Sequence, residues 1–226
     1  MIDLQRDGDV HVLRFDSAEN RFSPDFVDAF HAALDTVEKA EGPRALVTIG
    51  TGKFYSNGLD LDWLSAHLER LDAYMGRVYG LFARLLTFPM PTVAAINGHA
   101  FAAGAMLCLT HDFLVMRTDR GYFCLPEVDL GLTFPPPMNA LLQARLPKST
   151  AHEAMITGRR YPAAEARAAG IVHHAVPEAE VLPTAIGVAA PLAAKNGRTV
   201  AEIRSALYAP VIDLLTSPPS ASSASS

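Results

Sequence analysis

Residues 96–112 constrain the fold of this 226-residue chain more than any other stretch. An apolar strand over residues 91–96 runs into a turn of small residues, and this turn opens directly into an apolar helix. Small residues at such a junction let a ligand approach the backbone closely. The first turn of a helix also presents unpaired N–H groups with a partial positive charge. The pattern predicts a site for an acyl oxygen that becomes negative during a reaction; a turn needed only for packing is the alternative.

Composition narrows the class of protein. Half of the residues are hydrophobic, and at this length that suits one large domain, or one domain with a small appendage. The net charge of −5 disfavours nucleic acid as a partner. No apolar run reaches the roughly 18 residues that span a bilayer, and the first residues show no signal-peptide pattern. Cys108 and Cys124 form no CxxC motif, so we expect reduced, buried thiols in a reducing compartment.

Strand and helix patterns alternate over the first two thirds of the chain, and only helices follow. This order predicts an α/β core with a helical C-terminal part. The expected strands cover residues 2–16 (a hairpin around Asp7-Gly8), 44–50, 92–97, 113–118, 122–125 and 171–176. The expected helices begin at Pro24, at Asp62, at Met138, at Thr150 (in a capping box) and at Pro162, and further helical segments follow to about residue 216. Residues 51–61 are expected as a loop and residues 217–226 as a disordered tail.

Four motifs in this order resemble the crotonase superfamily, the enoyl-CoA hydratases and isomerases. They are residues 54–61 (FYSNGLDL), 96–112, 125–131 (LPEVDLG) and 158–172, and the resemblance runs from about residue 8 to about residue 205. It implies an acyl-CoA enzyme whose core, residues 1–176, is a spiral of repeated ββα units. It further implies a helical trimerisation region over residues 177–216, and homotrimers or hexamers.

The resemblance also implies the catalytic groups. Two backbone N–H groups, those of Leu59 and Ala103, would form an oxyanion hole for the thioester carbonyl, although alanine at 102 and 103 resists positive φ. Glu127 would be the single acid/base, with a pKa raised by desolvation. Hydratases of the superfamily carry a second glutamate at the position of Met106, and methionine can neither activate water nor donate a proton.

A single glutamate beside an oxyanion hole implies a 3,2-enoyl-CoA isomerase. Glu127 would take a proton from C2 of 3-enoyl-CoA and return it to C4, giving 2-trans-enoyl-CoA. Three alternatives stay open: a hydratase, another crotonase reaction such as thioester hydrolysis, and a CoA-binding protein with little catalysis. A carboxylate held in an apolar pocket disfavours the last of these, because its burial lowers stability without a task.

The remaining expectations concern binding. Substrate or CoA contacts are expected from Arg21, Ser56, Gly58, Asp60, Leu61, His99, Ala102 and Pro126. The alternatives are an exposed charge for Arg21, a structural hydrogen bond for His99 and a helix cap for Asp60. We expect no metal, since His173-His174 lacks a third ligand at metal spacing, and no tightly bound cofactor, with coenzyme A entering as part of the substrate. The expected location is cytoplasmic, or peroxisomal if a C-terminal signal has been lost.

Overall fold

Two sheets, one mainly and one wholly parallel, organise the chain in the computed structural model, which describes residues 1–217. The larger sheet has the strand order β1-β2-β3-β5-β7-β9, in which only β1 and β2 are antiparallel, and the smaller has the order β4-β6-β8. The strands are β1 (Ile2–Asp7), β2 (Val10–Phe15), β3 (Ala45–Gly50), β4 (Phe54–Ser56), β5 (Thr92–Ile96), β6 (His99–Phe101), β7 (Phe113–Arg117), β8 (Phe123–Cys124) and β9 (His174–Val176). The tail expected from residue 217 onward lies outside the described residues except for Ser217.

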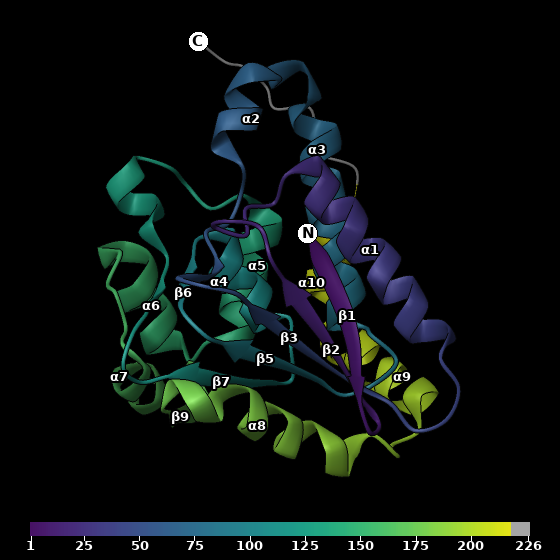
Figure 1. Cartoon of the computed structure of the whole chain (residues 1–226). Coiled ribbons are helices and arrows are strands. Elements are labelled where there is room, and N and C mark those ends of the chain that lie inside the picture. The colour runs from purple at the N-terminus through teal and green to yellow at the C-terminus, as the bar shows by residue number, and fades with distance from the viewer. Residues whose placement is uncertain (218–226) are drawn as a thin grey trace.

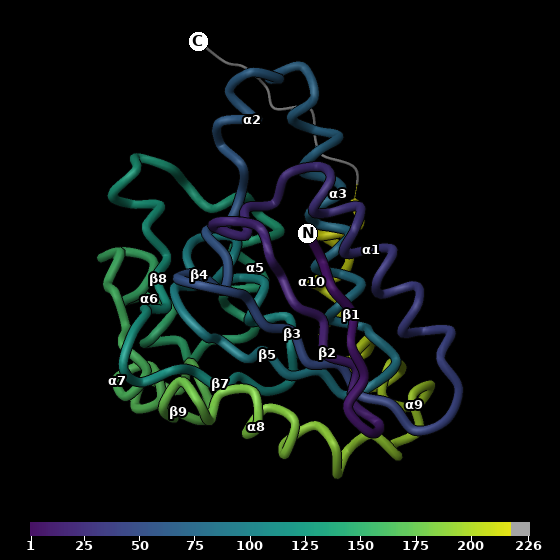
Figure 2. The backbone as a smooth tube through the Cα atoms, in the orientation of Figure 1, coloured from purple at the N-terminus to yellow at the C-terminus, as the bar shows by residue number. Residues whose placement is uncertain are grey.

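The helices pack on both faces of the larger sheet (Figures 1 and 2). Helix α8 covers one face, and α1, α3 and α10 contribute to the larger apolar core on the other. The helices are α1 (Pro24–Lys39), α2 (Leu61–Ala66), α3 (Leu71–Leu86), α4 (Ala103–Leu109), α5 (Pro136–Arg145), α6 (Lys148–Thr157), α7 (Ala163–Ala168), α8 (Glu178–Ala189), α9 (Gly197–Leu207) and α10 (Ala209–Thr216), with the 3-10 helices η1 (Leu68–Arg70), η2 (Pro126–Leu130) and η3 (Ala190–Leu192).

The chain repeats one path three times. A strand of the larger sheet leads into a strand of the smaller sheet and then into helix: β3 to β4 to α2, β5 to β6 to α4, and β7 to β8 to η2. These turns stack on one another, because β3, β5 and β7 are neighbours in the larger sheet and β4, β6 and β8 are neighbours in the smaller one. The expected spiral of ββα units is therefore confirmed, and each turn carries one of the three predicted catalytic segments just after its short strand.

Two local expectations are wrong because the strands involved are very short. The loop expected over residues 51–61 contains β4, and the turn expected to open directly into a helix contains β6. Each strand has three residues, too few for an alternation of apolar and polar residues to reveal it. Pairing of β6 with both β4 and β8 is what makes them strands.

Two helix expectations also need correction. The helix expected from Asp62 to about residue 88 is broken at His67, where φ is −139° and the ring Nδ1 lies 2.8 Å from the Trp63 carbonyl oxygen that an unbroken helix would use. Thr150 opens no capping box: α6 begins at Lys148, and the Thr150 hydroxyl donates to the carbonyl of Ala169 at 2.7 Å. The expected end of α6 at Gly158 is confirmed by its left-handed φ of +61°.

A partly buried ion pair connects α9 to the core. The Arg204 guanidinium on α9 donates to the carboxylate of Asp112 and to the Phe88 carbonyl at 2.5 Å. We expect Arg204→Met to lower the free energy of unfolding by about 3 kcal/mol, since Asp112 would lose its counter-charge in a partly buried position. Urea unfolding measures this. Arg198→Met, which breaks an exposed pair with Glu202 on the same helix, is the control and should change stability by about 0.5 kcal/mol or less; equal losses would contradict the assignment.

Candidate active site

The turn after β4 is held in shape by its own side chains and by a preceding loop. The Ser56 hydroxyl donates to the Asn20 carbonyl at 2.7 Å and accepts from the N–H of Gly58 at 3.1 Å. Gly58 has φ of +82°, a conformation that glycine adopts without strain, and its carbonyl accepts from the N–H of Phe22 at 2.8 Å. Among residues 1–217, the N–H of Leu59, which follows directly, has no hydrogen-bond acceptor.

The second segment joins β6 to α4. Ala102 has φ of +49°, which glycine tolerates and alanine resists, so the strain expected at this position is present. Ala103 is the first residue of α4, and within the described part of the chain its N–H also has no acceptor. Both proposed oxyanion donors are thus unpaired backbone groups.

These two segments touch, although 44 positions separate Leu59 and Ala103 in the sequence. A Cβ placed on Gly58 would lie 3.1 Å from the Ala103 nitrogen and 3.0 Å from the Phe101 carbonyl oxygen. A Cβ on Gly104 would overlap the Ser56 carbonyl and lie 2.8 Å from the Ser56 Cβ. Glycine at both positions is what allows the backbones to approach this closely.

Glu127 follows the third short strand. The N–H of Ala102 donates to the Cys124 carbonyl at 3.0 Å, which places the start of η2 beside the turn of small residues. The Glu127 side chain is only 8% exposed, and its Oε2 has no hydrogen-bond partner within residues 1–217. Burial raises the pKa of Glu127 to about 7. A carboxyl group in this state can both accept and release a proton near neutrality.

The structure places Met106 inside the site's supporting helix. It lies in α4, one turn after Ala103, and is completely buried. Among the described residues, Glu127 is the only acidic side chain that is buried. One desolvated carboxyl group therefore lies on the segment that follows β8, and two free N–H donors lie on the segments that follow β4 and β6.

Several predicted binding residues have structural partners. Asp60 caps α2, accepting from the N–H of Trp63 at 3.2 Å, as its alternative interpretation expected. The Arg21 guanidinium pairs with Glu19 at 2.8 Å and with Asp62 at 2.5 Å, so two carboxylates balance its charge. Leu61, at 50% exposure, is free to contact a ligand.

His99 lies in an aromatic cluster. Its ring is 5.3 Å from that of Phe54, 4.9 Å from Phe101 and 5.5 Å from Tyr122, measured between centroids. Burial, followed by the nearby cations, of which Lys53 contributes most, lowers the pKa of His99. Pro126, partly buried, begins η2 directly before Glu127.

Sequence reasoning missed the role of Asn20. This fully buried residue adopts φ of +50°, its amide donates to the Phe54 carbonyl at 3.1 Å, and its own carbonyl accepts from Ser56. The only available signal was its residue type, since asparagine is enriched among non-glycine residues with positive φ.

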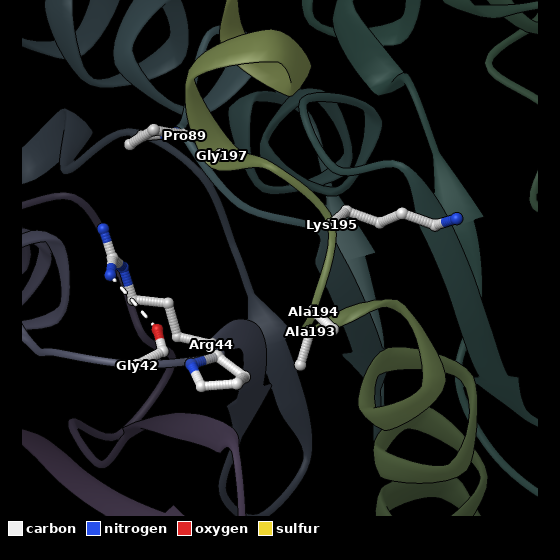
Figure 3. Close-up of a pocket in the computed structure, with 8 residues that line it drawn as sticks. Gly42, Arg44, Pro89, Ala193, Ala194, Lys195 and Gly197 are labelled. Atoms are coloured by element: carbon white, nitrogen blue, oxygen red, sulfur yellow. Dashed lines mark hydrogen bonds between the residues drawn. The ribbon is translucent and has the colours of Figure 1, made fainter.

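A separate pocket of about 270 Å³ lies between the segment before β3 and the start of α9 (Figure 3). Arg44 and Pro89 precede β3 and β5, so the pocket lies at the amino ends of these strands, whereas the site described above follows their carboxyl ends. Figure 3 shows the Arg44 guanidinium turned toward the carbonyl of Gly42, and the Lys195 side chain pointing away from that carbonyl. This pocket does not contribute to the candidate active site.

The ββα spiral with its unpaired donors and buried carboxyl group defines a crotonase-fold enzyme. The family model described as "Enoyl-CoA hydratase/isomerase" matches residues 6–220. The chain belongs to the enoyl-CoA hydratase/isomerase family.

Relatives of the chain are named both as isomerases and as hydratases. The chain is 36% identical to "Enoyl-CoA delta isomerase 2, peroxisomal" of Arabidopsis thaliana, with 95% of each chain covered. A structure of a "probable enoyl-CoA hydratase" from Mycobacterium tuberculosis has a TM-score of 0.89 at 26% identity, covering 96% of this chain and 92% of that one. A second structure of the same Mycobacterium tuberculosis protein, described as an apo enoyl-CoA isomerase, has a TM-score of 0.88 at 26% identity, covering 95% of this chain and 93% of that one.

Residues 1–217 also bear on membrane insertion and metal binding. No helix in that part of the chain is long and apolar enough to cross a membrane. No group of three or more His, Cys, Asp or Glu side chains there could hold a metal ion.

Proposed function

We propose that the protein is a 3,2-enoyl-CoA isomerase. The observation that carries this proposal is the carboxyl group of Glu127, the one buried carboxyl group within residues 1–217, whose pKa is raised to about 7 by burial. The isomerase name of the Arabidopsis relative supports it.

In the proposed reaction, the Glu127 carboxylate removes a proton from C2 of a 3-enoyl-CoA. The electron pair of the broken C–H bond delocalises into the thioester, and the negative oxygen accepts hydrogen bonds from the N–H groups of Leu59 and Ala103. The double bond moves to C2–C3 as C4 takes the proton back from Glu127. No water and no external reductant or oxidant enters, and the carboxylate is regenerated.

Hydration fits the site less well. Adding water across a double bond requires one group to activate the water and another to protonate the neighbouring carbon. Met106 is apolar and fully buried, so it supplies neither. One carboxyl group that moves a single proton is sufficient for isomerisation.

We propose that coenzyme A enters as part of the substrate and meets the turn that carries Gly58, Leu59 and Leu61. The exposed side chain of Leu61 supports this. Arg21 lies beside the same turn, but a CoA phosphate would have to displace Glu19 or Asp62 to use its full charge.

We propose that residues 177–216 make a homotrimer, or a hexamer of two trimers. Ile203 and Leu207 on α9 and Leu214 on α10 are large apolar side chains that are exposed in the single chain. A groove of about 490 Å³ between α5 and α10 adds to this surface. Apolar surface of this kind is typical of subunit contacts.

A paired assay tests the function. One purified sample receives 3-hexenoyl-CoA and, separately, 2-trans-hexenoyl-CoA, and the products are identified by mass and by ultraviolet absorbance. The proposal predicts 2-trans-enoyl-CoA from the first and no 3-hydroxyacyl-CoA from the second. Efficient hydration of the second substrate would contradict it, and turnover of neither would point to another acyl-CoA reaction or to binding alone.

The pH dependence of the rate should follow Glu127. The base is active when ionised, and its pKa is raised to about 7, so kcat/KM should fall about tenfold per pH unit below 7 and level off above it. Initial rates between pH 5 and 9 measure this profile. An inflection near 4.5, the ordinary value for glutamate, would contradict a desolvated base.

A further inference from the structure

Three polar side chains form a hydrogen-bonded chain in the core. Thr48 on β3, Tyr55 on β4 and His111 just after α4 are all buried. The Thr48 Oγ1 lies 2.8 Å from the Tyr55 hydroxyl and 2.9 Å from the His111 Nε2, and the His111 Nδ1 lies 3.0 Å from the Leu107 carbonyl oxygen. The proton-transfer steps proposed above use none of these groups.

The carbonyl of Leu107 fixes the direction of donation along these hydrogen bonds. The Leu107 carbonyl only accepts, so the His111 Nδ1 carries the hydrogen and Nε2 accepts from the Thr48 hydroxyl. The Thr48 oxygen then accepts from Tyr55. Burial lowers the pKa of His111 to about 4 and raises that of Tyr55 well above its usual value, so the ring is neutral and the phenol keeps its proton. Each group therefore donates to the next, from Tyr55 through Thr48 to His111, and all three side chains are uncharged.

The two ends of this series of hydrogen bonds lie in the two oxyanion segments, the turn after β4 that carries Leu59 and the helix α4 that begins with Ala103. Tyr55 precedes the Leu59 donor by four residues, on the strand that leads into its turn. Leu107 and His111 stand at the carboxyl end of α4, whose first residue is Ala103. Thr48 between them is on β3, inside the larger sheet between β2 and β5. The two oxyanion segments thus meet directly where Gly104 packs on Ser56, and they are also linked through hydrogen bonds to Thr48 in the larger sheet.

We infer that Thr48, with Tyr55 and His111, is a positioning residue that sets the separation between the N–H groups of Leu59 and Ala103. The inference rests on the proposed oxyanion hole. Donors stabilise an oxyanion only within about 2.7–3.1 Å of it, so small shifts of either segment weaken the transition state more than the bound substrate. None of the three side chains is placed in contact with substrate.

Thr48→Val tests this, because it removes the central hydroxyl and keeps the shape of the side chain. We expect kcat for isomerisation to fall roughly 10²-fold with KM changed less than about threefold. Thr48→Ser, which restores the hydroxyl, should recover at least half of the wild-type kcat. Thr150→Val is the matched control, since it also removes a buried threonine hydrogen bond, to the carbonyl of Ala169, and should leave kcat within twofold.

A second readout separates this inference from the proposed function. The carbonyl of bound hexanoyl-CoA, a saturated substrate analogue labelled with ¹³C at C1, should shift downfield in the NMR spectrum of the wild type and less in Thr48→Val. That result without isomerase activity would contradict the function and support the positioning role. A folded Thr48→Val with wild-type kcat and carbonyl shift would overturn the inference, as would equal losses in the Thr150→Val control or no carbonyl shift in the wild type.

Discussion

Replacement of Glu127 by glutamine is expected to lower kcat for isomerisation by roughly 10²- to 10⁴-fold, because the amide can neither remove nor return a proton. The affinity for acyl-CoA should change less than about threefold, since the N–H groups of Leu59 and Ala103 stay in place. Steady-state kinetics on 3-hexenoyl-CoA and calorimetric titration with a saturated acyl-CoA measure the two effects separately.

Stability provides an independent check on the same variant. The folded-state pKa of Glu127 is raised above its unfolded value, so its contribution to stability is full below about pH 4.5 and is lost as the pH rises through 7. Glu127→Gln should therefore unfold at a higher urea concentration than the wild type at pH 8, and the two should converge near pH 4. Glu180→Gln, at an exposed position, is the control. A Glu127→Gln enzyme with wild-type kcat would remove Glu127 from the mechanism.

Alanine at position 104 is expected to disrupt the site from within. Its Cβ would overlap the carbonyl oxygen of Ser56, so the turn after β4 and the start of α4 would have to move apart. Overpacking of this kind lowers stability by about 1–3 kcal/mol. Loss of one aligned oxyanion donor lowers kcat by about 10²- to 10³-fold. Urea unfolding and isomerase kinetics on Gly104→Ala measure the two effects.

The control is Gly80→Ala in the middle of α3. A Cβ at Gly80 meets no atom within 4 Å, and alanine is the better helix former, so stability should rise by about 0.5–1 kcal/mol with kcat unchanged. If Gly104→Ala kept both the stability and the kcat of the wild type, the close approach of the two oxyanion segments would not be a requirement of the site.

The sequence predicted the elements whose signals are local. The hairpin around Gly8 and the start of α1 at Pro24 follow from turn and helix-start chemistry within a few residues; the Ser23 hydroxyl caps this helix by accepting from the N–H of Phe26. The positions of Leu59, Ala103 and Glu127 came from motifs whose order resembles a known superfamily. Residue patterns alone would have identified a turn of small residues and an isolated glutamate.

What the sequence could not predict depends on contacts between distant segments. The strands β4 and β6 exist because they pair with each other, and the ring of His67 ends α2 by approaching a carbonyl that an unbroken helix would use. The approach of Gly58 to Ala103 joins residues 45 positions apart. Such pairings are set by tertiary packing, which single-residue propensities do not contain.

Isotope transfer tests the central claim most directly, that one buried carboxyl group carries one proton from C2 to C4. The substrate is 3-hexenoyl-CoA with deuterium at both C2 positions, converted in a single turnover in ordinary water and analysed for deuterium at C4. Because Glu127 is only 8% exposed, exchange of its deuteron with water should be slow enough for C4 to contain deuterium. Hydrogen from water alone at C4, even in the first turnover, would contradict a single shielded carrier.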